Sequence, residues 1–504
     1  MKKILEKKNI KKILKKTKNK KIVLCHGVFD LVHYGHILHF KSAKELGDIL
    51  IVSITKDKFI KKGIGRPLFN EFQRLKYLSE IEIIDYIYLC ETESAADSIK
   101  IFKPNFYVKG PDYKNNLLDK TKKILLEKKL VEKFKGIVIY TNDKKFSSSA
   151  IINDKNLLGF DNEQDDFIKM IKSKFGYDYI KNKLGGFQNE KPLLIGELIF
   201  DQYCFGNIIG KSGKEPHLVL KEIKNEFYVG GTGAVARHLS TFVNNIKLIS
   251  PFGGEAFFKK ILKKSFNKNI LSNFLKPNVN YHSIVKKRFI DQFSNYKMFG
   301  SYILPTKPND KFSDILISNI KKNIKNTNMM IICDYGHDFL DKKSAQFISK
   351  IKKFKALNAQ LNSANIGYHT LNNYKDIDAL IINEAELRQE LRGEKLDLSI
   401  LAKILIDKNR IKNLIVTSGA AGVMLFRKNL KTITCPAFAS QAIDKVGAGD
   451  AMLSIAALAI KQDLEPEITL FLGSIAAAIS VKSIGNKVSV DINELDRIIQ
   501  FMLK

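Results

Sequence analysis

The stretch His26–His36 (HGVFDLVHYGH) decides the fold of the first part of the chain. It follows a short apolar run, Lys21–Cys25, and precedes Ile37–Leu46, whose apolar residues recur with helical periodicity. A continuous apolar run, Asp48–Ile54, then has the composition of a buried strand. Strand, loop, helix and strand in this order form the βαβ unit of a parallel sheet. The sequence therefore predicts an α/β domain that begins with this unit.

The loop of this unit has the composition of a phosphate-binding turn. Gly35 allows the backbone to approach a phosphate closely, and His33 and His36 stand where the helix opens. Two imidazoles at this place can donate hydrogen bonds to an α-phosphate in a charge-rich transition state. A metal site is one alternative, but it needs further ligands at suitable spacing, and none is evident nearby in the sequence. The other alternative is that His33 and His36 are surface residues without a function. Their occurrence in one short stretch with Gly27, Phe29 and Gly35 argues against this alternative.

A second phosphate-binding stretch, Asp444–Asp450 (DKVGAGD), lies near the other end of the chain. Gly447, Ala448 and Gly449 are small, so backbone N–H groups at the start of a helix remain accessible to γ-phosphoryl oxygens. Asp450 would then lie beside the incoming hydroxyl group and accept its proton. Taken alone, these residues could also form an ordinary loop. The two stretches are too far apart for one local motif, so we expect two catalytic domains.

Length and composition agree with two globular α/β domains. The 504 residues exceed the usual size of one hydrophobic core, and the hydrophobic content of 45% is ordinary for a folded protein. The chain becomes polar and acidic around residues 153–166. We expect a first domain over residues 1–155, a linker over 156–191 and a larger second domain over 192–504. The further predicted strands are Tyr86–Leu89, Phe106–Lys109 and Gly136–Tyr140 in the first domain, and Leu193–Ile195, Lys247–Ser250, Met329–Cys333, Ala379–Ile382 and Leu414–Thr417 in the second.

The charge of the chain bears on its partners. The net charge of +32 arises from 84 Lys and Arg against 52 Asp and Glu. Proteins that bind nucleic acid or an anionic membrane also have such an excess of basic residues. The basic residues are nearly all Lys and are spread along the chain without an Arg cluster. We therefore expect neither nucleic acid nor membrane as a partner. The positive charge still favours anionic, phosphorylated substrates.

The apolar segments and the cysteines indicate a cytoplasmic protein. Met1–Lys21 lacks the apolar core of a signal peptide and predicts an amphipathic helix built on Ile4, Leu5, Ile13 and Leu14. The longest apolar stretches, 451–460 and 470–481, are too short to span a bilayer and predict buried helices. The five cysteines are single and widely spaced, which is typical of buried thiols in a reducing compartment.

Several segments of the first part resemble the cytidylyltransferase-like nucleotidyltransferases, a family with a Rossmann-like fold. GVFDLVHYGH resembles the family signature, GRPLFNEFQR with Arg66 and Arg74 its RP…R stretch, and YVKGPDY at Tyr107–Tyr113 its KGxDY segment. FSSSAI resembles a late motif rich in Ser and Thr that holds the triphosphate, although a plain helix cap is the alternative. The resemblance implies that Lys44 meets the attacking phosphate. It further implies nucleotide or phosphate binding by Gly27, Phe29, Gly35, Lys109, Ser147, Ser148 and Ser149.

The second part resembles the ribokinase-like carbohydrate kinases of the phosphofructokinase-B type. GGTGAVARHL at Gly230–Leu239 resembles their first signature, and DKVGAGD resembles their second, with Asp450 as the base. NEAE at Asn383–Glu386 resembles their NxxE motif, and VTSGAAG at Val416–Gly422 their nucleotide-side turn. The resemblance implies sugar binding by Asp201, Gly230, Gly231 and Arg288, nucleotide binding by Thr417, Gly419, Gly422, Gly447, Ala448 and Gly449, and organisation of Mg²⁺ by Asn383 and Glu386.

Both families occur joined in bifunctional heptose-phosphate kinase / heptose-1-phosphate nucleotidyltransferases, which activate heptose for bacterial surface glycans. Those enzymes carry the kinase domain first, whereas in this chain the nucleotidyltransferase domain comes first. The resemblance implies that Mg²⁺ and ATP phosphorylate a sugar phosphate, and that ATP or CTP donates a nucleotidyl group to a sugar-1-phosphate. Sugar phosphates and NTPs are the expected partners, and a homodimer is left open. The alternative is an alditol-phosphate cytidylyltransferase fused to an unrelated ribokinase-like kinase. Ala234, Lys445 and Val446 depart from the kinase pattern, which leaves the sugar open.

Overall fold

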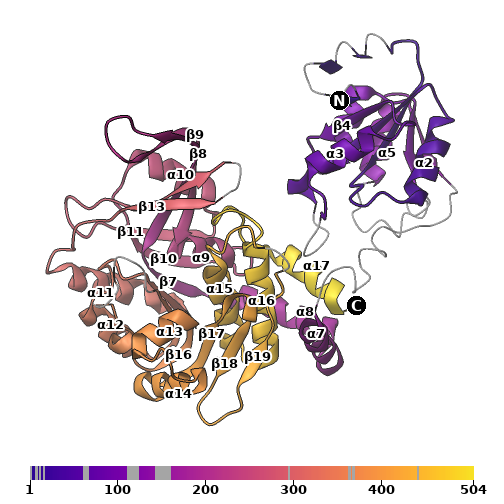
Figure 1. Cartoon of the computed structure of the whole chain (residues 1–504). Coiled ribbons are helices and arrows are strands. Elements are labelled where there is room, and N and C mark those ends of the chain that lie inside the picture. The colour runs from indigo at the N-terminus through magenta and orange to yellow at the C-terminus, as the bar shows by residue number, and fades with distance from the viewer. Residues whose placement is uncertain are drawn as a thin grey trace. The chain divides into compact units, whose positions relative to one another are not determined.

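The computed structural model describes residues 3–5, 9–10, 13–14, 17–60, 67–110, 124–141, 161–292, 296–360, 365, 369–439 and 442–503. The chain divides into two compact units, Met1–Phe160 and Asp161–Lys504 (Figure 1). Each unit is built around a mainly parallel sheet with helices on its faces, which confirms the predicted α/β class. In the described part of the chain, none of the helices has the length and apolar composition that a bilayer crossing requires.

A parallel sheet with the order β1-β4-β3-β2-β5-β6 forms the centre of the first unit, as far as its described residues go. All residues of β3 are buried, as expected for a strand covered on both faces. Apolar residues of α2 and α3 pack on one face, and those of α4 and α5 on the other. The elements are β1 (Ile4–Leu5), β2 (Ile22–Gly27), α2 (Tyr34–Lys44), β3 (Ile49–Thr55), η1 (Asp57–Phe59), α3 (Glu71–Ser79), β4 (Tyr86–Cys90), α4 (Ala96–Phe102), β5 (Phe106–Lys109), α5 (Ile124–Lys133) and β6 (Ile137–Tyr140).

The strand order of this sheet fixes where a ligand can bind. From β2 the chain moves outward through β3 and β4, and it then returns to the other side of β2 to form β5 and β6. Such a reversal opens a crevice at the carboxyl ends of the central strands. The loop after β2, which carries the His motif, lies at this crevice.

The second unit contains a larger sheet, with the order β11-β10-β7-β14-β15-β16-β17-β18-β19 among its described strands. In this spatial order, neighbouring strands pair in parallel from β11 as far as β17. Strands β18 and β19 are added in antiparallel pairing. Helices α11 to α14 cover one face and α9, α15 and α16 the other. The strands are β7 (Pro192–Gly196), β10 (Ile246–Pro251), β11 (Ile270–Leu275), β14 (Met329–Asp334), β15 (Phe354–Ala359), β16 (Ile377–Asn383), β17 (Ile411–Thr417), β18 (Val423–Phe426) and β19 (Ile433–Cys435).

The helices of this unit follow its strands in the alternation that a parallel sheet requires. Apolar residues dominate α15 and α16, which are buried along most of their length, as the sequence predicts. The described helices are α7 (Asn162–Lys174), α8 (Tyr177–Gly186), α9 (Thr232–Leu239), α10 (Ala256–Ser265), α11 (Phe312–Asn323), α12 (Lys342–Ser349), α13 (Glu384–Leu391), α14 (Leu398–Asn409), α15 (Ala448–Lys461), α16 (Pro466–Ser480) and α17 (Ile492–Leu503), with short 3₁₀ turns η4 (Phe187–Asn189), η5 (Ile324–Asn326), η6 (Leu371–Asn373) and η7 (Gly419–Ala421).

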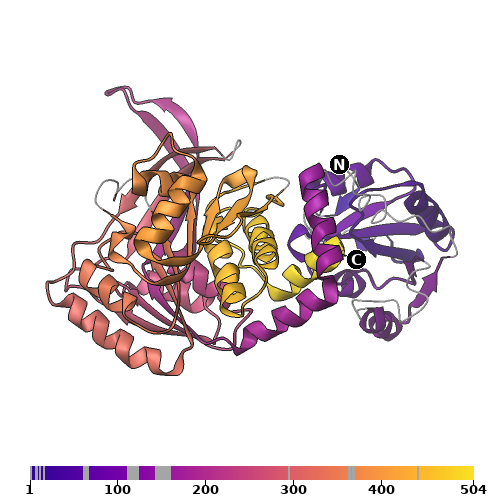
Figure 2. The ribbon, with the colours of Figure 1, turned by 90° about the horizontal axis from the view of Figure 1, so that it is seen from below.

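A second, smaller sheet of the same unit has the order β13-β12-β8-β9 among the strands described. Figure 2 shows the hairpin of β8 (Leu198–Lys211) and β9 (Leu218–Gly231) projecting from the body of the unit. Strands β12 (Ile284–Asp291) and β13 (Lys297–Ile303) complete this sheet. The sequence does not predict it, because much of β9 and β13 faces solvent and the strands lack a buried, alternating apolar pattern.

Two segments differ from the sequence expectations. Ile4 and Leu5, expected in an amphipathic helix, form β1 and pair in parallel with β4, because Leu5 is buried at the edge of the sheet. Residues 162–174 and 177–186 form α7 and α8, and these helices belong to the second unit rather than to a separate linker over 156–191. The hydroxyl group of Tyr177 donates to Asp496 of α17 at 2.9 Å, which ties α8 to this unit.

All of the predicted strands are present, with small shifts of their bounds. The predicted helix at Ile37–Leu46 is also confirmed as α2, which begins three residues earlier at Tyr34. The five cysteines are free and buried, as expected.

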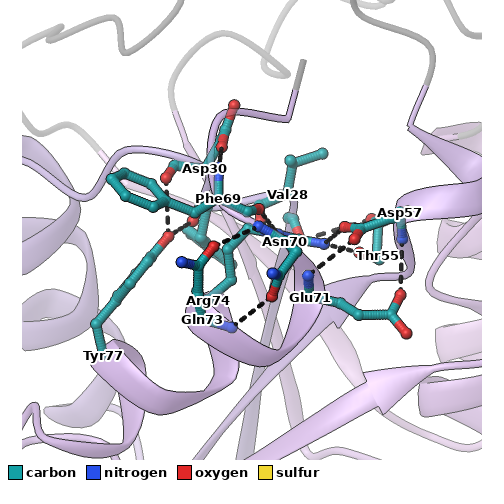
Figure 3. Close-up of polar contacts among 12 residues, drawn as sticks. Val28, Asp30, Thr55, Asp57, Phe69, Asn70, Glu71, Gln73, Arg74 and Tyr77 are labelled. Atoms are coloured by element: carbon teal, nitrogen blue, oxygen red, sulfur yellow. Dashed lines mark hydrogen bonds and ion pairs between the residues drawn. The ribbon is translucent and has the colours of Figure 1, made fainter. Parts of the chain in front are cut away.

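Arg74 of α3 connects three loops at the carboxyl edge of the first sheet (Figure 3). Its Nη1 donates to the carbonyl oxygen of Val28 at 2.6 Å, directly after β2. Its Nη2 donates to the carbonyl oxygen of Thr55 at 2.8 Å and to Oδ1 of Asp57 at 2.6 Å, after β3. Its Nε donates to the carbonyl oxygen of Phe69 at 3.0 Å, before α3. The fully buried guanidinium therefore fixes the loop that leads to the His motif.

Replacing Arg74 by Met is expected to lower the free energy of unfolding of the first unit by about 3 kcal/mol, because a buried set of acceptors loses its donor. Hydrogen exchange of the β2 and β3 amides in the full chain measures this loss. Lys76→Met is the matched control, since Lys76 lies on the same helix with an exposed side chain, and it should change stability by less than about 0.5 kcal/mol. Equal effects of the two substitutions would contradict the role of Arg74.

Candidate functional site

The two motif histidines of the first unit cap the helix α2. Nδ1 of His33, the N-cap residue, accepts the N–H group of Gly35 at 3.1 Å. Nδ1 of His36 accepts the N–H group of His33 at 3.3 Å, which completes a reciprocal capping box. Because both Nδ1 atoms accept, a neutral ring carries its proton on Nε2 and can donate it there. Burial lowers the pKa of His33, which favours this neutral form.

The two imidazole rings lie together, with centroids 4.0 Å apart and an angle of 30° between their planes. The ring of Phe29 packs edge-on against His36, with centroids 5.4 Å apart. The carbonyl oxygen of Phe29 accepts a hydrogen bond from the Tyr77 hydroxyl group. The structure therefore brings Phe29, Gly35, His33 and His36 together where α2 begins.

Lys109 lies at the carboxyl end of β5, the neighbour of β2. Its Nζ is 3.5 Å from Oε2 of Glu127, and both side chains are buried. Glu127 also accepts the N–H group of Ala95 at 2.8 Å and the hydroxyl group of Tyr107 at 2.9 Å. The opposing charge of Lys109 helps to keep the pKa of Glu127 below its usual value despite burial. Lys109 therefore lies at the edge where the His motif lies, with its charge paired to the carboxylate of Glu127.

Sequence reasoning missed His26, the last polar side chain of β2. Its Nδ1 lies 2.7 Å from Oγ of Ser53 in β3. Thr55 Oγ1, at the end of the same strand, lies 3.4 Å from Nε2 of His26. His26 is the first residue of the stretch His26–His36, and this position could have indicated that it belongs to the site.

Lys44 is not brought to the histidine pair, which corrects the sequence expectation. It is the last residue of α2, about 16 Å along the helix from His33 at a rise of 1.5 Å per residue. Its Nζ binds Oδ2 of Asp85 at 2.5 Å and the carbonyl oxygen of Asp48 at 2.7 Å, beside the amino end of β3. A helix that connects parallel strands runs back across the sheet, so its two ends lie at opposite edges. Four other predicted residues, Arg66, Ser147, Ser148 and Ser149, lie outside the described residues.

The GAGD stretch of the second unit begins α15. Gly447 is the N-cap residue, with φ of +90°, and Ala448 and Gly449 are the first residues of the helix. Gly447 needs this backbone conformation and its lack of a side chain, since a Cβ there would overlap Oδ1 of Asn486. The N–H group of Ala448 donates to the carbonyl oxygen of Lys445 at 3.4 Å, a long hydrogen bond. The N–H groups of Gly449 and Asp450 have no acceptor within the helix, so they can bind an anion.

Asp444 holds the loop in front of this turn. Its Oδ2 accepts the hydroxyl group of Tyr203 at 2.9 Å and the N–H group of Gly485 at 3.0 Å. Its Oδ1 accepts the N–H group of Val446 at 3.0 Å and pairs with Nζ of Lys297, from β13 of the smaller sheet. Sequence reasoning gave no role to Asp444, although it is the first residue of the DKVGAGD stretch. This buried carboxylate fixes the loop that carries the anion-binding turn.

Asp450 lies in the first turn of α15, where its Oδ1 accepts the hydroxyl group of Tyr335 at 2.9 Å. The pKa of Asp450 is raised from its ordinary 3.8 to about 6, chiefly by burial and in addition by the charge of the nearby Asp201. The Tyr335 hydrogen bond and the charge of Lys286 act in the opposite direction. The carboxylate is therefore ionised at neutral pH but more basic than an exposed aspartate, as a general base requires.

The residues expected to bind the sugar also lie together. Oδ1 of Asp201, in β8, accepts a hydrogen bond from Nη1 of Arg288, in β12, at 2.5 Å. Gly230 lies directly behind this carboxylate, and a Cβ there would overlap Oδ2 of Asp201. Gly231 follows as the N-cap residue of α9. The buried Asp201 carboxylate can accept hydrogen bonds from a pair of hydroxyl groups.

Asn383 and Glu386 form the capping box of α13. Oδ1 of Asn383 accepts the N–H group of Glu386, and Oε2 of Glu386 accepts the N–H group of Asn383, both at 2.8 Å. Thr417 at the end of β17 pairs with Asn383 in the strand register, and η7 with Gly419 and then Gly422 follows it. No cage of three or more acidic, His or Cys side chains exists among the described residues. Magnesium in phosphoryl transfer needs only one or two carboxylates besides the phosphates, so Glu386 fits this pattern.

Comparison with known proteins agrees with this architecture. The pattern of the pfkB family carbohydrate kinases matches residues 190–493, and the cytidylyltransferase-like pattern matches residues 24–154. The bifunctional protein HldE of Campylobacter jejuni subsp. jejuni is 42% identical over 108 residues, which are 21% of this chain and 23% of that protein. HldE of C. jejuni subsp. doylei is 37% identical over 153 residues, 30% of this chain and 31% of that protein. The matched stretches thus span less than a third of these relatives.

A solved structure shows the same fold for the second unit. Phosphofructokinase-2 from Escherichia coli, in complex with potassium, superposes with a TM-score of 0.52 at 16% sequence identity. The superposition covers 62% of this chain and 99% of that protein. The pfkB match extends over more than half of the chain. The chain therefore belongs to the pfkB family of carbohydrate kinases, and an additional unit with a cytidylyltransferase-like fold precedes its kinase unit.

Proposed function

We propose that the chain catalyses two reactions in the synthesis of a nucleotide-activated sugar of the ADP-heptose type. The second unit would transfer the γ-phosphoryl group of ATP to a hydroxyl group of a sugar phosphate. The first unit would transfer a nucleotidyl group from ATP or CTP to a sugar-1-phosphate and release pyrophosphate. The observation that carries this proposal is the Asp450 carboxylate beside the anion-binding turn of α15, within a unit that also holds Asp201 and Arg288. The local identity to HldE proteins supports the pairing with nucleotidyl transfer.

In the kinase reaction, Asp450 takes the proton of the acceptor hydroxyl group as its oxygen attacks the γ-phosphorus. The N–H groups at Gly447, Ala448 and Gly449 stabilise the charge on the transferring oxygens, and ADP leaves. Asp201, held by Arg288, orients the sugar. A magnesium ion, when bound near Glu386, neutralises charge on the phosphates.

In the nucleotidyl transfer, a phosphate oxygen of the sugar-1-phosphate attacks the α-phosphorus and pyrophosphate leaves. His33 and His36 donate Nε2–H hydrogen bonds to the α-phosphate oxygens as negative charge increases there. Lys109 contributes a positive charge at the same edge of the sheet. The helix start at Gly35 adds N–H groups that favour an anion.

We also infer a cytoplasmic location from the five free and buried cysteines, which are typical of a reducing compartment. The identity of the sugar is best determined by offering heptose and hexose phosphates with ATP and identifying the products by mass spectrometry. Formation of no phosphorylated sugar from any member of the panel would contradict the kinase assignment.

Asp450→Asn is expected to lower sugar phosphorylation at least 100-fold, because the base is lost, and to leave nucleotidyl transfer unchanged. Release of ADP and release of pyrophosphate measure the two reactions separately. Asp407→Asn is the matched control, since Asp407 is an exposed carboxylate of the same unit that pairs with Lys428, and it should keep both rates. A folded Asp450→Asn protein that lost both activities would contradict the division of labour.

The double variant His33→Asn/His36→Gln is expected to show the converse loss. Asn is a good N-cap residue and Gln completes a capping box, so the start of α2 is retained while both imidazoles are removed. Nucleotidyl transfer should fall at least 100-fold and phosphorylation should remain. Circular dichroism and both product assays check the result, and wild-type pyrophosphate release would refute the role of the histidines.

Phosphorylation is expected to depend on the ionisation of Asp450. Its pKa is raised to about 6, so the base becomes protonated as the pH falls through this value, well above the range of an ordinary aspartate. The value of kcat/KM should then fall about tenfold for each pH unit below the pKa. A pH–rate profile measures this limb. An unchanged rate down to about pH 4.5 would exclude a base with this pKa.

A further inference from the structure

Tyr335 connects two elements that meet at the kinase site. It directly follows β14 and is 3% exposed, and its hydroxyl group donates to Oδ1 of Asp450 at the start of α15 at 2.9 Å. The bond thus runs from the carboxyl end of a central strand to the carboxylate that we assign as the base. The hydrogen bond engages one oxygen of this carboxylate, and the second oxygen can accept the proton of a substrate hydroxyl group.

The backbone around Tyr335 is fixed on both sides. Its N–H group donates to Oε2 of Glu197 at 3.0 Å, and the N–H group of His337 donates to Oε1 of the same carboxylate at 3.1 Å. Its carbonyl oxygen accepts Nδ2 of Asn365 at 3.0 Å. Glu197 is fully buried and directly follows β7. These bonds hold the turn after β14, so the phenol ring meets Asp450 from a fixed direction.

The charged groups around Asp450 come from several elements. Asp201 of β8 opposes its ionisation, whereas Lys286 of β12 and the Tyr335 hydroxyl group favour it. Burial raises the pKa of the thiol group of Cys333, in β14, well above its ordinary value, and the charge of Asp450 raises it as well. Burial likewise raises the pKa of Tyr335 well above its ordinary value. Tyr335 therefore remains a protonated donor over the working pH range.

We propose that Tyr335 is a positioning residue of the kinase reaction, which holds Oδ1 of Asp450 so that Oδ2 faces the acceptor hydroxyl group. The inference rests on the proposed role of Asp450 as the base. Tyr335 acts through this carboxylate, and its loss affects the proton-transfer step rather than the binding of the sugar.

The test is Tyr335→Phe in the full chain, which removes the hydroxyl group and retains the ring. We expect kcat for phosphorylation to fall about 10-fold, with KM for the sugar phosphate changed by less than about twofold. The acid limb of the pH–rate profile should move to higher pH, because the carboxylate loses a hydrogen bond that favours its charged form. Nucleotidyl transfer should keep its rate.

Tyr177→Phe is the matched control, because it removes a tyrosine–carboxylate hydrogen bond of the same length, to Asp496, between α8 and α17. It should leave kcat and the acid limb unchanged. A Tyr335→Phe protein with the wild-type limb and wild-type kcat would overturn the inference, and so would an equal loss in Tyr177→Phe. Asp450→Asn distinguishes a failure of the proposed base from a failure of the positioning role. Full activity of that variant would refute the proposed base itself, whereas its inactivity beside an unaffected Tyr335→Phe would refute only the positioning role.

Discussion

The start of a helix at the carboxyl edge of a parallel sheet is the constraint on which both sites depend. A helix that connects parallel strands begins where one strand ends, so its first N–H groups point toward the crevice at that edge. In the first unit this helix is α2, capped by His33. In the second unit α15, capped by Gly447, connects no parallel strands, but it also begins at the carboxyl edge, because its Asp450 accepts a hydrogen bond from Tyr335, which directly follows β14. The two sites differ in what the sequence adds there. The first adds a pair of imidazoles and the second a carboxylate.

Buried polar side chains behind each helix start hold it in place. Arg74 binds the loops after β2 and β3 in the first unit. In the second unit Asp444 binds the loop before α15, and Glu197 binds the turn that carries Tyr335. Each of these groups is buried with hydrogen-bonding partners, so removal of one partner leaves the others unsatisfied. These side chains contribute order around the sites, and the proposed chemistry belongs to His33, His36 and Asp450, which are partly buried.

The sequence predicts the sheets well, because fully buried parallel strands are continuous apolar runs such as β3 and β14. It fails for the smaller sheet of β8, β9, β12 and β13, because β9 and β13 face solvent along much of their length. Motif spacing predicts that His33 meets His36, since both lie within one helical turn. It could not exclude Lys44, which is close in sequence but lies at the other end of α2. The contacts of Tyr335 with Glu197 and Asp450 could not be predicted, because they join residues more than 100 positions apart.

The central claim is that one chain directs attack at the outermost phosphorus of a nucleotide in one unit and at the innermost phosphorus in the other. The most direct measurement supplies the intact protein with sugar phosphates and ATP that is labelled at either the γ or the α phosphorus. The account predicts the γ label on a phosphorylated sugar and the α label in a nucleotide sugar. Transfer of neither label to any sugar, or recovery of the α label only in ADP, would contradict it.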